Sequence, residues 1–301
     1  MADSSIGSLT QSWVAEHLPP RPARAHKGDF GRLLVIAGST EYPGAAMLAA
    51  LGAMRVGAGT VRVAVAETVA ARMAGVAPEL TWMVLDEEAP GLIAPSGWRR
   101  VTTEAGRYDA VVIGPGLGRH PAAQRRIRNL VARLRVPAAI DADGLNALAA
   151  GGDWWTGVRA PLVLTPHPGE FARLIGADAP PEDDDLARST AAHDAARRWG
   201  TVVVLKGPNT IVAGPGGALL RSDVASPALA TAGTGDVLAG MVGALLAGGM
   251  DSLLAAGCAV AIHAAAGRIA EDRIGTAGVM ARDVAALLPE AMQQLRGDRR
   301  G

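Results

Sequence analysis

Short runs of aliphatic and β-branched residues alternate along this chain with longer segments in which apolar residues recur at helical spacing. The runs of strand length are residues 32–37, 60–66, 108–113, 138–141, 161–165 and 201–206. Segments of helical length follow most of them, at residues 44–55, 121–134, 144–150, 168–175 and 183–199. This alternation predicts an α/β fold with a mostly parallel central sheet and helices on both faces. In such sheets ligands bind at the carboxyl ends of the strands.

The rest of the chain adds a hairpin, three helices and two peripheral segments. Residues 209–212 and 218–221 flank a turn rich in Gly and Pro, which predicts a hairpin near the sheet edge. Residues 86–107 are polar and contain Pro and Gly, so we expect a peripheral excursion there. The expected C-terminal helices are residues 235–247, 253–271 and 280–295.

The domain organisation is expected to be simple. Residues 1–25 are polar and include a stiff Pro-rich stretch, which predicts a leader segment without a core of its own. Neither a linker nor an internal repeat divides the remainder, so residues 26–301 are predicted to form a single domain.

The composition narrows the classes of function. Hydrophobic residues make up 49% of the 301 residues but aromatic residues only 3%, so the core must be closely packed Ala, Val, Leu and Ile. The 29 Lys and Arg residues balance the 29 Asp and Glu residues, which gives no global field for nucleic acid or an anionic membrane. The single cysteine, Cys258, excludes an internal disulfide and fits a reducing, cytoplasmic location.

The most apolar segment, residues 253–270, is interpreted as a buried helix. It is rich in alanine and contains His263 and Arg268, whereas a membrane span would need a longer and more apolar run. Nothing near His263 has metal-ligand spacing, so we expect a core or interface histidine. Residues 1–20 lack the charged and apolar regions of a signal peptide.

A glycine-rich segment at the start of a predicted helix is the main candidate for chemistry. Gly233 and Gly235 let backbone N–H groups converge, and a helix that begins there adds unpaired N–H groups and the positive end of its dipole. Asp236 would face an anion bound at this point. A carboxylate beside a phosphate suggests either a metal or a catalytic base. The alternative is an ordinary helix start with an acid in its first turn.

A second glycine-rich loop, Gly114-Pro115-Gly116-Leu117-Gly118, follows a predicted strand and precedes a helix. Its spacing differs from the G-x-G-x-x-G fingerprint, and Pro115 removes an N–H that a pyrophosphate could use. We therefore reject a Rossmann dinucleotide site and expect a loop that lines a ligand site.

Acidic and amide groups end the predicted strand at residues 138–141. Asp141, Asp143 and Asn146 could hold Mg²⁺ through water, because hard cations take oxygen ligands. Equally, Asp143 could cap the following helix with Asn146 as a local partner.

Two further strand ends carry groups suited to a ligand. Pro166 and Pro168 fix the backbone around His167, and with the neighbouring Glu170 this favours ligand contact over a structural role. Lys206 follows a buried strand, where contact with a phosphate or nucleotide best explains an ammonium group. The alternative is a hairpin corner from which Lys206 reaches solvent.

Taken together, these motifs resemble those of one family, the ADP/ATP-dependent NAD(P)H-hydrate dehydratases, which have a three-layer ribokinase-like fold. The resemblance runs from about Leu18 to Leu295. In this family an epimerase domain is often fused at the N-terminus; the chain resembles the stand-alone form, so an epimerase is expected to act separately. The motifs are Lys27-Gly28-Asp29-Phe30-Gly31, Gly38-Ser39, Gly44-Ala45-Ala46, Gly114-Pro115-Gly116-Leu117-Gly118, Asp141-Ala142-Asp143-Gly144-Leu145-Asn146, Thr165-Pro166-His167-Pro168-Gly169-Glu170, Lys206-Gly207 and Ala232-Gly233-Thr234-Gly235-Asp236.

The resemblance implies a repair reaction on nicotinamide nucleotides. The S-epimer of hydrated NADH or NADPH is dehydrated at the expense of ADP or ATP, which gives AMP or ADP and phosphate. Hydroxide is a poor leaving group, whereas a phosphorylated hydroxyl leaves readily. The enzyme therefore needs a base, an anion hole and charge neutralisation, as a kinase does.

The resemblance also implies roles for individual residues. Asp236 is the expected catalytic base, Gly233, Thr234 and Gly235 the anion hole, and Glu170 and Asn146 candidates for organising Mg²⁺ through water. The implied substrate contacts are Ala45, Gly116, His167 and Asp236. The implied nucleotide contacts are Lys206, Gly207, Pro208, Asn209, Thr210 and Gly235.

The family further leads us to expect a homo-oligomer, namely a tetramer, in the cytoplasm. Two other functions fit the same residues less well. A small-molecule kinase for a vitamin precursor or sugar would use the same acid and anion hole, but would yield a stable phosphorylated product. A non-catalytic nucleotide sensor would not need the base Asp236.

Overall fold

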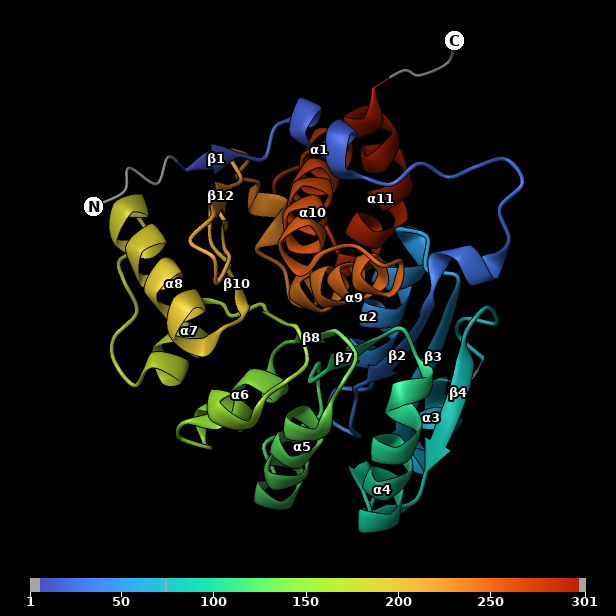
Figure 1. Cartoon of the computed structure of the whole chain (residues 1–301). Helices are drawn as coiled ribbons and strands as arrows, with labels where there is room; N and C mark the ends of the chain where they lie inside the picture. Colours follow the sequence, from blue (N-terminus) through green and yellow to red (C-terminus); the bar gives the residue numbers. More distant parts are fainter. Residues whose placement is uncertain (1–5, 74, 298–301) are drawn as a thin grey trace.

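The structure is a computed structural model, and it describes residues 6–73 and 75–297. A central ten-stranded sheet runs through the molecule (Figure 1). Its strands are β1 (Gly7–Ser8), β2 (Arg32–Ile36), β3 (Thr60–Ala66), β4 (Thr81–Leu85), β7 (Ala110–Ile113), β8 (Ala138–Ile140), β9 (Leu162–Leu164), β10 (Val202–Leu205), β11 (Ile211–Ala213) and β12 (Leu219–Arg221). A separate two-stranded sheet pairs β5 (Glu87–Ala89) with β6 (Leu92–Ile93).

The strand order in the central sheet is β1-β12-β11-β10-β9-β8-β7-β2-β3-β4. All neighbouring pairs from β4 to β10 are parallel, while β11 pairs antiparallel with both β10 and β12. The predicted mostly parallel sheet and its edge hairpin are therefore confirmed.

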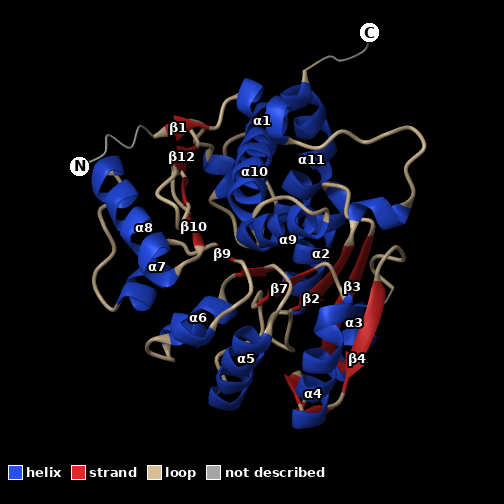
Figure 2. Ribbon diagram, viewed as in Figure 1, coloured by secondary structure: helices blue, strands red, loops and turns tan. Residues whose placement is uncertain are grey.

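Helices cover both faces of the sheet, as Figure 2 shows. One face carries α2, α9, α10 and α11, and the opposite face carries α4 to α8. The helices are α1 (Gln11–His17), α2 (Pro43–Arg55), α3 (Glu67–Met73), α4 (Pro95–Glu104), α5 (Pro121–Arg133), α6 (Asp143–Ala149), α7 (Pro168–Ile175), α8 (Asp185–Trp199), α9 (Thr234–Ala247), α10 (Ser252–Ile274) and α11 (Ala281–Arg296). Short 3₁₀ helices lie at Lys27–Phe30, Ala105–Arg107, Trp154–Gly157 and Pro227–Leu229.

The chain reverses its direction across the sheet between β2 and β7. From β2 it continues outward through β3 and β4, whereas β7, β8, β9 and β10 follow one another in the opposite direction. The backbone N–H of Gly38, after β2, donates to the carbonyl oxygen of Pro115, after β7, at 2.7 Å. Such a switch point opens a crevice at the carboxyl ends of the strands, where ligands bind.

Helices α2 and α9 pack with their backbones in contact. A Cβ atom at Gly240 would lie 1.8 Å from the carbonyl oxygen of Ala49, and one at Gly52 would lie 2.3 Å from that of Val237. Small residues thus replace aromatic ones in this part of the core, as the composition predicts. The close approach fixes the start of α9 relative to α2.

The N-terminal segment differs from the expected leader. Within residues 7–18, β1 pairs with β12 and α1 packs against α10 and α11. Val14 is fully buried, and Leu9 and Leu18 are nearly so. These residues therefore belong to the packed fold, because a few apolar side chains in a polar stretch suffice to hold it; residues 1–5 lie outside the described residues.

Residues 86–107 are also more integrated than expected. Helix α4 lies against β4 and buries Trp98 and Val101. Strand β4 itself, at the sheet edge, had no counterpart among the predicted strands. The polar residues of this region lie on the solvent side of α4. Because they outnumber the buried ones, the sequence pattern did not indicate an apolar helix face here.

Helix α10 is confirmed as a buried helix. In the described part of the chain it is the helix long and apolar enough to cross a membrane, yet 78% of its most apolar window is buried within the protein. Cys258 and His263 both lie among these buried residues.

Candidate active site

Polar groups from four strand and helix ends converge at the carboxyl edge of the sheet. Lys206, after β10, places its Nζ atom 2.9 Å from Oδ1 of Asp141, after β8. The hydroxyl of Thr165, after β9, donates to the same oxygen at 2.7 Å. Glu170 Oε2, in the first turn of α7, lies 3.9 Å from Lys206 Nζ. The strand ends thus form one charged cluster, as the parallel topology requires.

The start of α9 faces this cluster. Gly233 has φ +93°, and the Thr234 hydroxyl donates to the carbonyl oxygens of Leu229 and Thr231, which fixes the turn. Within the described residues, the backbone N–H groups of Gly235 and Asp236 have no hydrogen-bond partner. A Cβ atom at Gly235 would lie 3.2 Å from Lys206 Nζ. Free amides and an ammonium group therefore meet at one point, which is suited to an anion.

The electrostatics of the cluster prepare Asp236 as a base. Burial, and next the charge of Asp141, raise the pKa of Asp236 to about 7, although Lys206 opposes this change. Burial would lower the pKa of Lys206, but the carboxylates of Asp141 and Glu170 outweigh it, so the net pKa of Lys206 is raised. Lys206 therefore stays charged while Asp236 titrates near neutral pH, where a general base works best.

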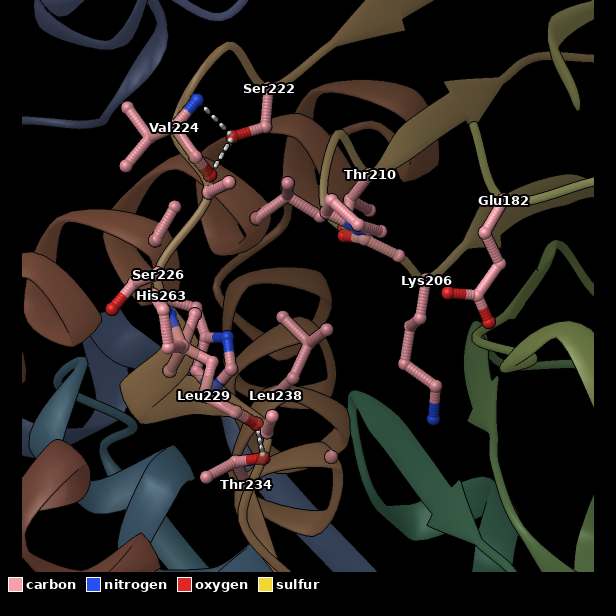
Figure 3. Close-up of a pocket in the computed structure, with 18 residues that line it drawn as sticks. Glu182, Lys206, Thr210, Ser222, Val224, Ser226, Leu229, Thr234, Leu238 and His263 are labelled. Carbon is pink, nitrogen blue, oxygen red and sulfur yellow. Dashed lines mark hydrogen bonds between the residues drawn. The ribbon is translucent and has the colours of Figure 1, made fainter. Parts of the chain in front are cut away.

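A cavity of about 440 Å³ extends from this point (Figure 3). Lys206, Gly207 and Thr210 line its polar end together with the start of α9. The other end is apolar and is lined by residues 224–230 and by α10. A phosphate end beside an apolar end suits a nucleotide.

His263 lines the same cavity, beside Leu229 in Figure 3. The expectation of a core histidine is confirmed, because only 8% of the residue is exposed. Burial lowers its pKa to about 4, so the ring is neutral at physiological pH. Its place on the cavity wall was not predicted, because no sequence signal relates α10 to the Lys206 loop.

The second glycine-rich loop lies against the N-terminus of α2. Gly116 has φ +65°, and a Cβ atom there would lie 2.7 Å from Cβ of Tyr42 and 2.8 Å from Cβ of Ala45. One turn further along α2, Leu48 Cδ1 lies 2.5 Å from the position of a Cβ at Gly233. Ala45 and Gly116 are therefore connected to the start of α9 through the packing of α2.

His167 stands at the N-terminus of α7. Its Nδ1 accepts from the backbone N–H of Gly169 at 3.1 Å, and Glu170 Oε2 accepts from the His167 N–H at 3.0 Å. The side chain is 51% exposed. Burial, followed by the charges of Lys206 and Arg173, lowers the pKa of His167, and its Nε2 lies 3.5 Å from Glu170 Oε1.

The two residues considered for Mg²⁺ have other partners. Asn146 Oδ1 accepts from Arg173 Nε at 2.8 Å, and its Nδ2 donates to Asp143 Oδ1 at 3.2 Å. Glu170 caps α7 and faces Lys206. The described residues contain no group of three or more His, Cys, Asp or Glu side chains arranged to hold a metal ion. Asn146 and Glu170 therefore orient neighbouring side chains, and their role in organising Mg²⁺ through water stays a prediction.

Asp143 does not cap α6 either. Residue Ala142 precedes the helix without a side-chain cap, and Asp143 Oδ2 instead accepts from the backbone N–H of Gly118 at 2.8 Å. Asp143 thus ties the Gly114–Gly118 loop to α6.

Sequence reasoning missed Arg188, which is 1% exposed and donates hydrogen bonds to carbonyl oxygens in and next to the Lys206–Thr210 loop. Its guanidinium donates to the carbonyl oxygens of Asn209 at 3.1 Å and Leu205 at 3.4 Å, and to Asp185 at 3.2 Å. Asp185 in turn accepts from Asn209 Nδ2 at 3.0 Å. One signal in the sequence could have indicated that Arg188 is buried: it lies one helical turn before the apolar Ala192, so both residues share one face of α8.

Comparisons with known proteins identify the family to which the chain is similar. Residues 33–290 match the family model described as NAD(P)H-hydrate dehydratase. The ADP-dependent (S)-NAD(P)H-hydrate dehydratase of Xanthomonas campestris is 36% identical over 300 residues, which cover 96% of this chain and 98% of that protein. The crystal structure of the ADP/ATP-dependent NAD(P)H-hydrate dehydratase of Bacillus subtilis, co-crystallised with ATP and Mg²⁺, matches with a TM-score of 0.84 at 33% identity, covering 97% of this chain and 99% of that one.

Longer relatives match as well. A bifunctional NAD(P)H-hydrate repair enzyme of Moorella thermoacetica is 39% identical over 287 residues, which cover 95% of this chain and 54% of that enzyme. The chain spans about half the length of the bifunctional curated relatives it matches.

Proposed function

Because the chain belongs to the NAD(P)H-hydrate dehydratase family, we propose that it dehydrates the S-epimer of hydrated NADH or NADPH at the expense of ADP or ATP. The products are NADH or NADPH, phosphate, and AMP or ADP. The fold is the three-layer ribokinase-like arrangement predicted from the sequence. The observation that carries the proposal is the partly buried carboxylate of Asp236, with a pKa of about 7, beside Lys206 and the free amides of α9.

The nucleotide occupies the cavity between the Lys206–Thr210 loop and α10. Lys206 and the N–H groups of Gly235 and Asp236 hold the phosphoryl group that is transferred, because these N–H groups have no partner among the described residues and Lys206 Nζ lies beside Gly235. Lys206, Gly207, Pro208, Asn209 and Thr210 form the loop that carries the phosphates, and Arg188 fixes its carbonyl groups.

The hydrated nicotinamide lies on the other side of Asp236, against Ala45, Gly116 and His167. Asp236 removes the proton of the ring hydroxyl as that oxygen attacks the terminal phosphoryl group, so the P–O bond to the nucleotide breaks. The ring nitrogen then pushes out phosphate, and loss of a proton from the neighbouring carbon restores the double bond. The anion hole stabilises the charge that develops on the phosphoryl oxygens.

Mg²⁺ is proposed only as a companion of the nucleotide, by analogy with the Bacillus subtilis relative co-crystallised with ATP and Mg²⁺. The step described above uses none of the ion's chemistry. We further propose a cytoplasmic homotetramer that works beside a separate epimerase; the longer relatives are named bifunctional repair enzymes.

The proposal is tested by incubating the protein with hydrated NADH or NADPH and with ADP or ATP in turn. Recovery of reduced-nicotinamide absorbance together with equimolar phosphate supports it. A stable phosphorylated dinucleotide without recovery would instead make the protein a kinase.

A further inference from the structure

Two arginines beside His167 are joined by one acid and one amide. Arg119 Nε lies 3.5 Å from Asp143 Oδ1, which also accepts from Asn146 Nδ2 at 3.2 Å. On the other side, Asn146 Oδ1 accepts from Arg173 Nε at 2.8 Å. The loop after β7, helix α6 and helix α7 are therefore linked through the chain Arg119–Asp143–Asn146–Arg173, which we call the arginine pair network.

Each arginine enters the network through Nε, and its terminal nitrogens donate no hydrogen bond. Within the described residues, this holds for the Nη atoms of both Arg119 and Arg173. The Arg119 side chain is 65% exposed, and Arg173 is exposed as well. Two oriented forks in contact with solvent are the groups that bind phosphate in a bidentate manner.

Charged groups of both signs surround His167. Burial is the first cause of its lowered pKa, and the positive charges of Lys206, Arg173 and Arg119 lower it further. Lys206 is engaged with Asp141 and Glu170. Among the described residues, Asp143 is the carboxylate that pairs with Arg119, and no carboxylate lies within ion-pair distance of Arg173. Arg173 is therefore available to an anionic substrate.

The nucleotide cavity does not account for these arginines. Its lining comes from the Lys206–Thr210 loop, residues 222–230 and helices α9 and α10, and it includes neither arginine nor His167. Gly118, whose N–H is held by Asp143, follows two residues after Gly116 in the loop that borders Ala45. The arginine pair network is therefore joined to the Gly114–Gly118 loop, which is assigned to the dinucleotide.

We propose that Arg119 and Arg173 bind a phosphate group of the hydrated dinucleotide, with Asp143 and Asn146 as positioning residues. This inference rests on the proposed function for the identity of the dinucleotide. The shared chemistry is a phosphate anion, which is either the pyrophosphate common to both substrates or the 2′-phosphate of the NADPH form.

Direct binding and kinetics together test the proposal. The variants are Arg119→Gln, Arg173→Gln and the double variant, and the matched control is Arg125→Gln, an exposed arginine on α5. Binding of NADH and of NADPH, which carry the same phosphates as their hydrates, is followed by nicotinamide fluorescence at low and high salt. The KM values for each hydrate and for ADP are measured in parallel.

A hydrogen bond to a charged group contributes enough that each variant should weaken dinucleotide binding roughly 10-fold or more. The KM for ADP should stay within about twofold, and the salt dependence of dinucleotide binding should weaken. An equal loss for NADH and NADPH assigns the pyrophosphate, and a loss confined to NADPH assigns the 2′-phosphate. Asn146→Leu should reproduce part of the Arg173 effect, because it frees that side chain.

The inference is overturned if the double variant binds both dinucleotides as tightly as the Arg125→Gln control does, or if the unmodified protein binds neither. Its failure is distinct from failure of the proposed function. A protein that binds NADPH through the arginines but dehydrates no hydrate contradicts the function alone, whereas an active enzyme indifferent to both substitutions contradicts the inference alone.

Discussion

Lys206 Nζ lies 3.2 Å from the position that a Cβ atom would take at Gly235, so a methyl group at residue 235 would press on the ammonium. Lys206 is held there by Asp141 at 2.9 Å and faces the free amides of α9. The nucleotide loop and the anion hole therefore depend on each other through this single contact.

Gly235→Ala should displace the Lys206 ammonium from the anion hole without unfolding the protein, because the end of a lysine side chain can move. Loss of one charged hydrogen bond to phosphate predicts a fall in kcat/KM for ADP of roughly 10- to 100-fold. Steady-state kinetics over a range of ADP concentrations measure it. Gly248→Ala, at the other end of α9 where a Cβ would make only ordinary contacts of 3.5 Å, is the control. Unchanged kinetics in Gly235→Ala would mean that this contact has no catalytic importance.

The activity should depend on pH through Asp236. Its pKa is raised to about 7, so the carboxylate is protonated below that pH and kcat/KM should fall as the pH drops below about 7. Burial is the main cause and the charge of Asp141 the next, so Asp141→Asn should move this acidic limb to lower pH. A pH profile of both proteins measures the shift, with Asp194→Asn on the exposed side of α8 as the control. If the acidic limb of the pH profile stays at the same pH in Asp141→Asn, the charge of Asp141 does not raise the pKa of Asp236.

Arg188 should matter for the nucleotide loop and for stability. Arg188→Ala leaves buried carbonyl groups and Asp185 without a partner, which should lower the free energy of unfolding by about 3 kcal/mol or more. Arg188→Lys keeps the charge but not the fork, so it should fold and raise the KM for ADP while the KM for the hydrate stays unchanged. Denaturant titrations and substrate kinetics separate the two effects. Equal increases in both KM values would indicate a general loss of structure.

Gly240→Ala should be strongly destabilising, since its Cβ would lie 1.8 Å from the carbonyl oxygen of Ala49. The added methyl group would force α2 and α9 apart. Such overpacking lowers the free energy of unfolding by about 1–3 kcal/mol or more. Gly44 lies on α2 next to open space, so Gly44→Ala should leave the melting temperature nearly unchanged or raise it. Similar melting temperatures for the two variants would contradict the packing described here.

Much of the site could be predicted from local patterns. Lys206, Asp141 and His167 each follow a strand, and parallel strands end at one edge, so their convergence follows from the alternation of strands and helices. The free amides at Gly235 follow from a glycine-rich helix start.

The remaining features depend on contacts between distant segments. Arg188 stands in a helix with several other arginines, and its burial depends on the carbonyl groups of a loop that follows the next strand. Asn146 accepts a hydrogen bond from Arg173, which lies 27 residues away on another helix. No local pattern in the sequence records such pairings.

The most direct test of the account is the turnover of Asp236→Asn with hydrated NADH and ADP, followed by absorbance and phosphate release. The substitution removes the base but keeps its shape. It also removes a partly buried carboxylate whose pKa is raised above its unfolded value, so its charged form costs stability as the pH rises from the unfolded pKa to about 7. We therefore predict that turnover falls by at least about 100-fold, while ADP still binds and the melting temperature at pH 8 stays level or rises. Turnover equal to that of the unmodified protein would contradict the assignment of Asp236 as the base.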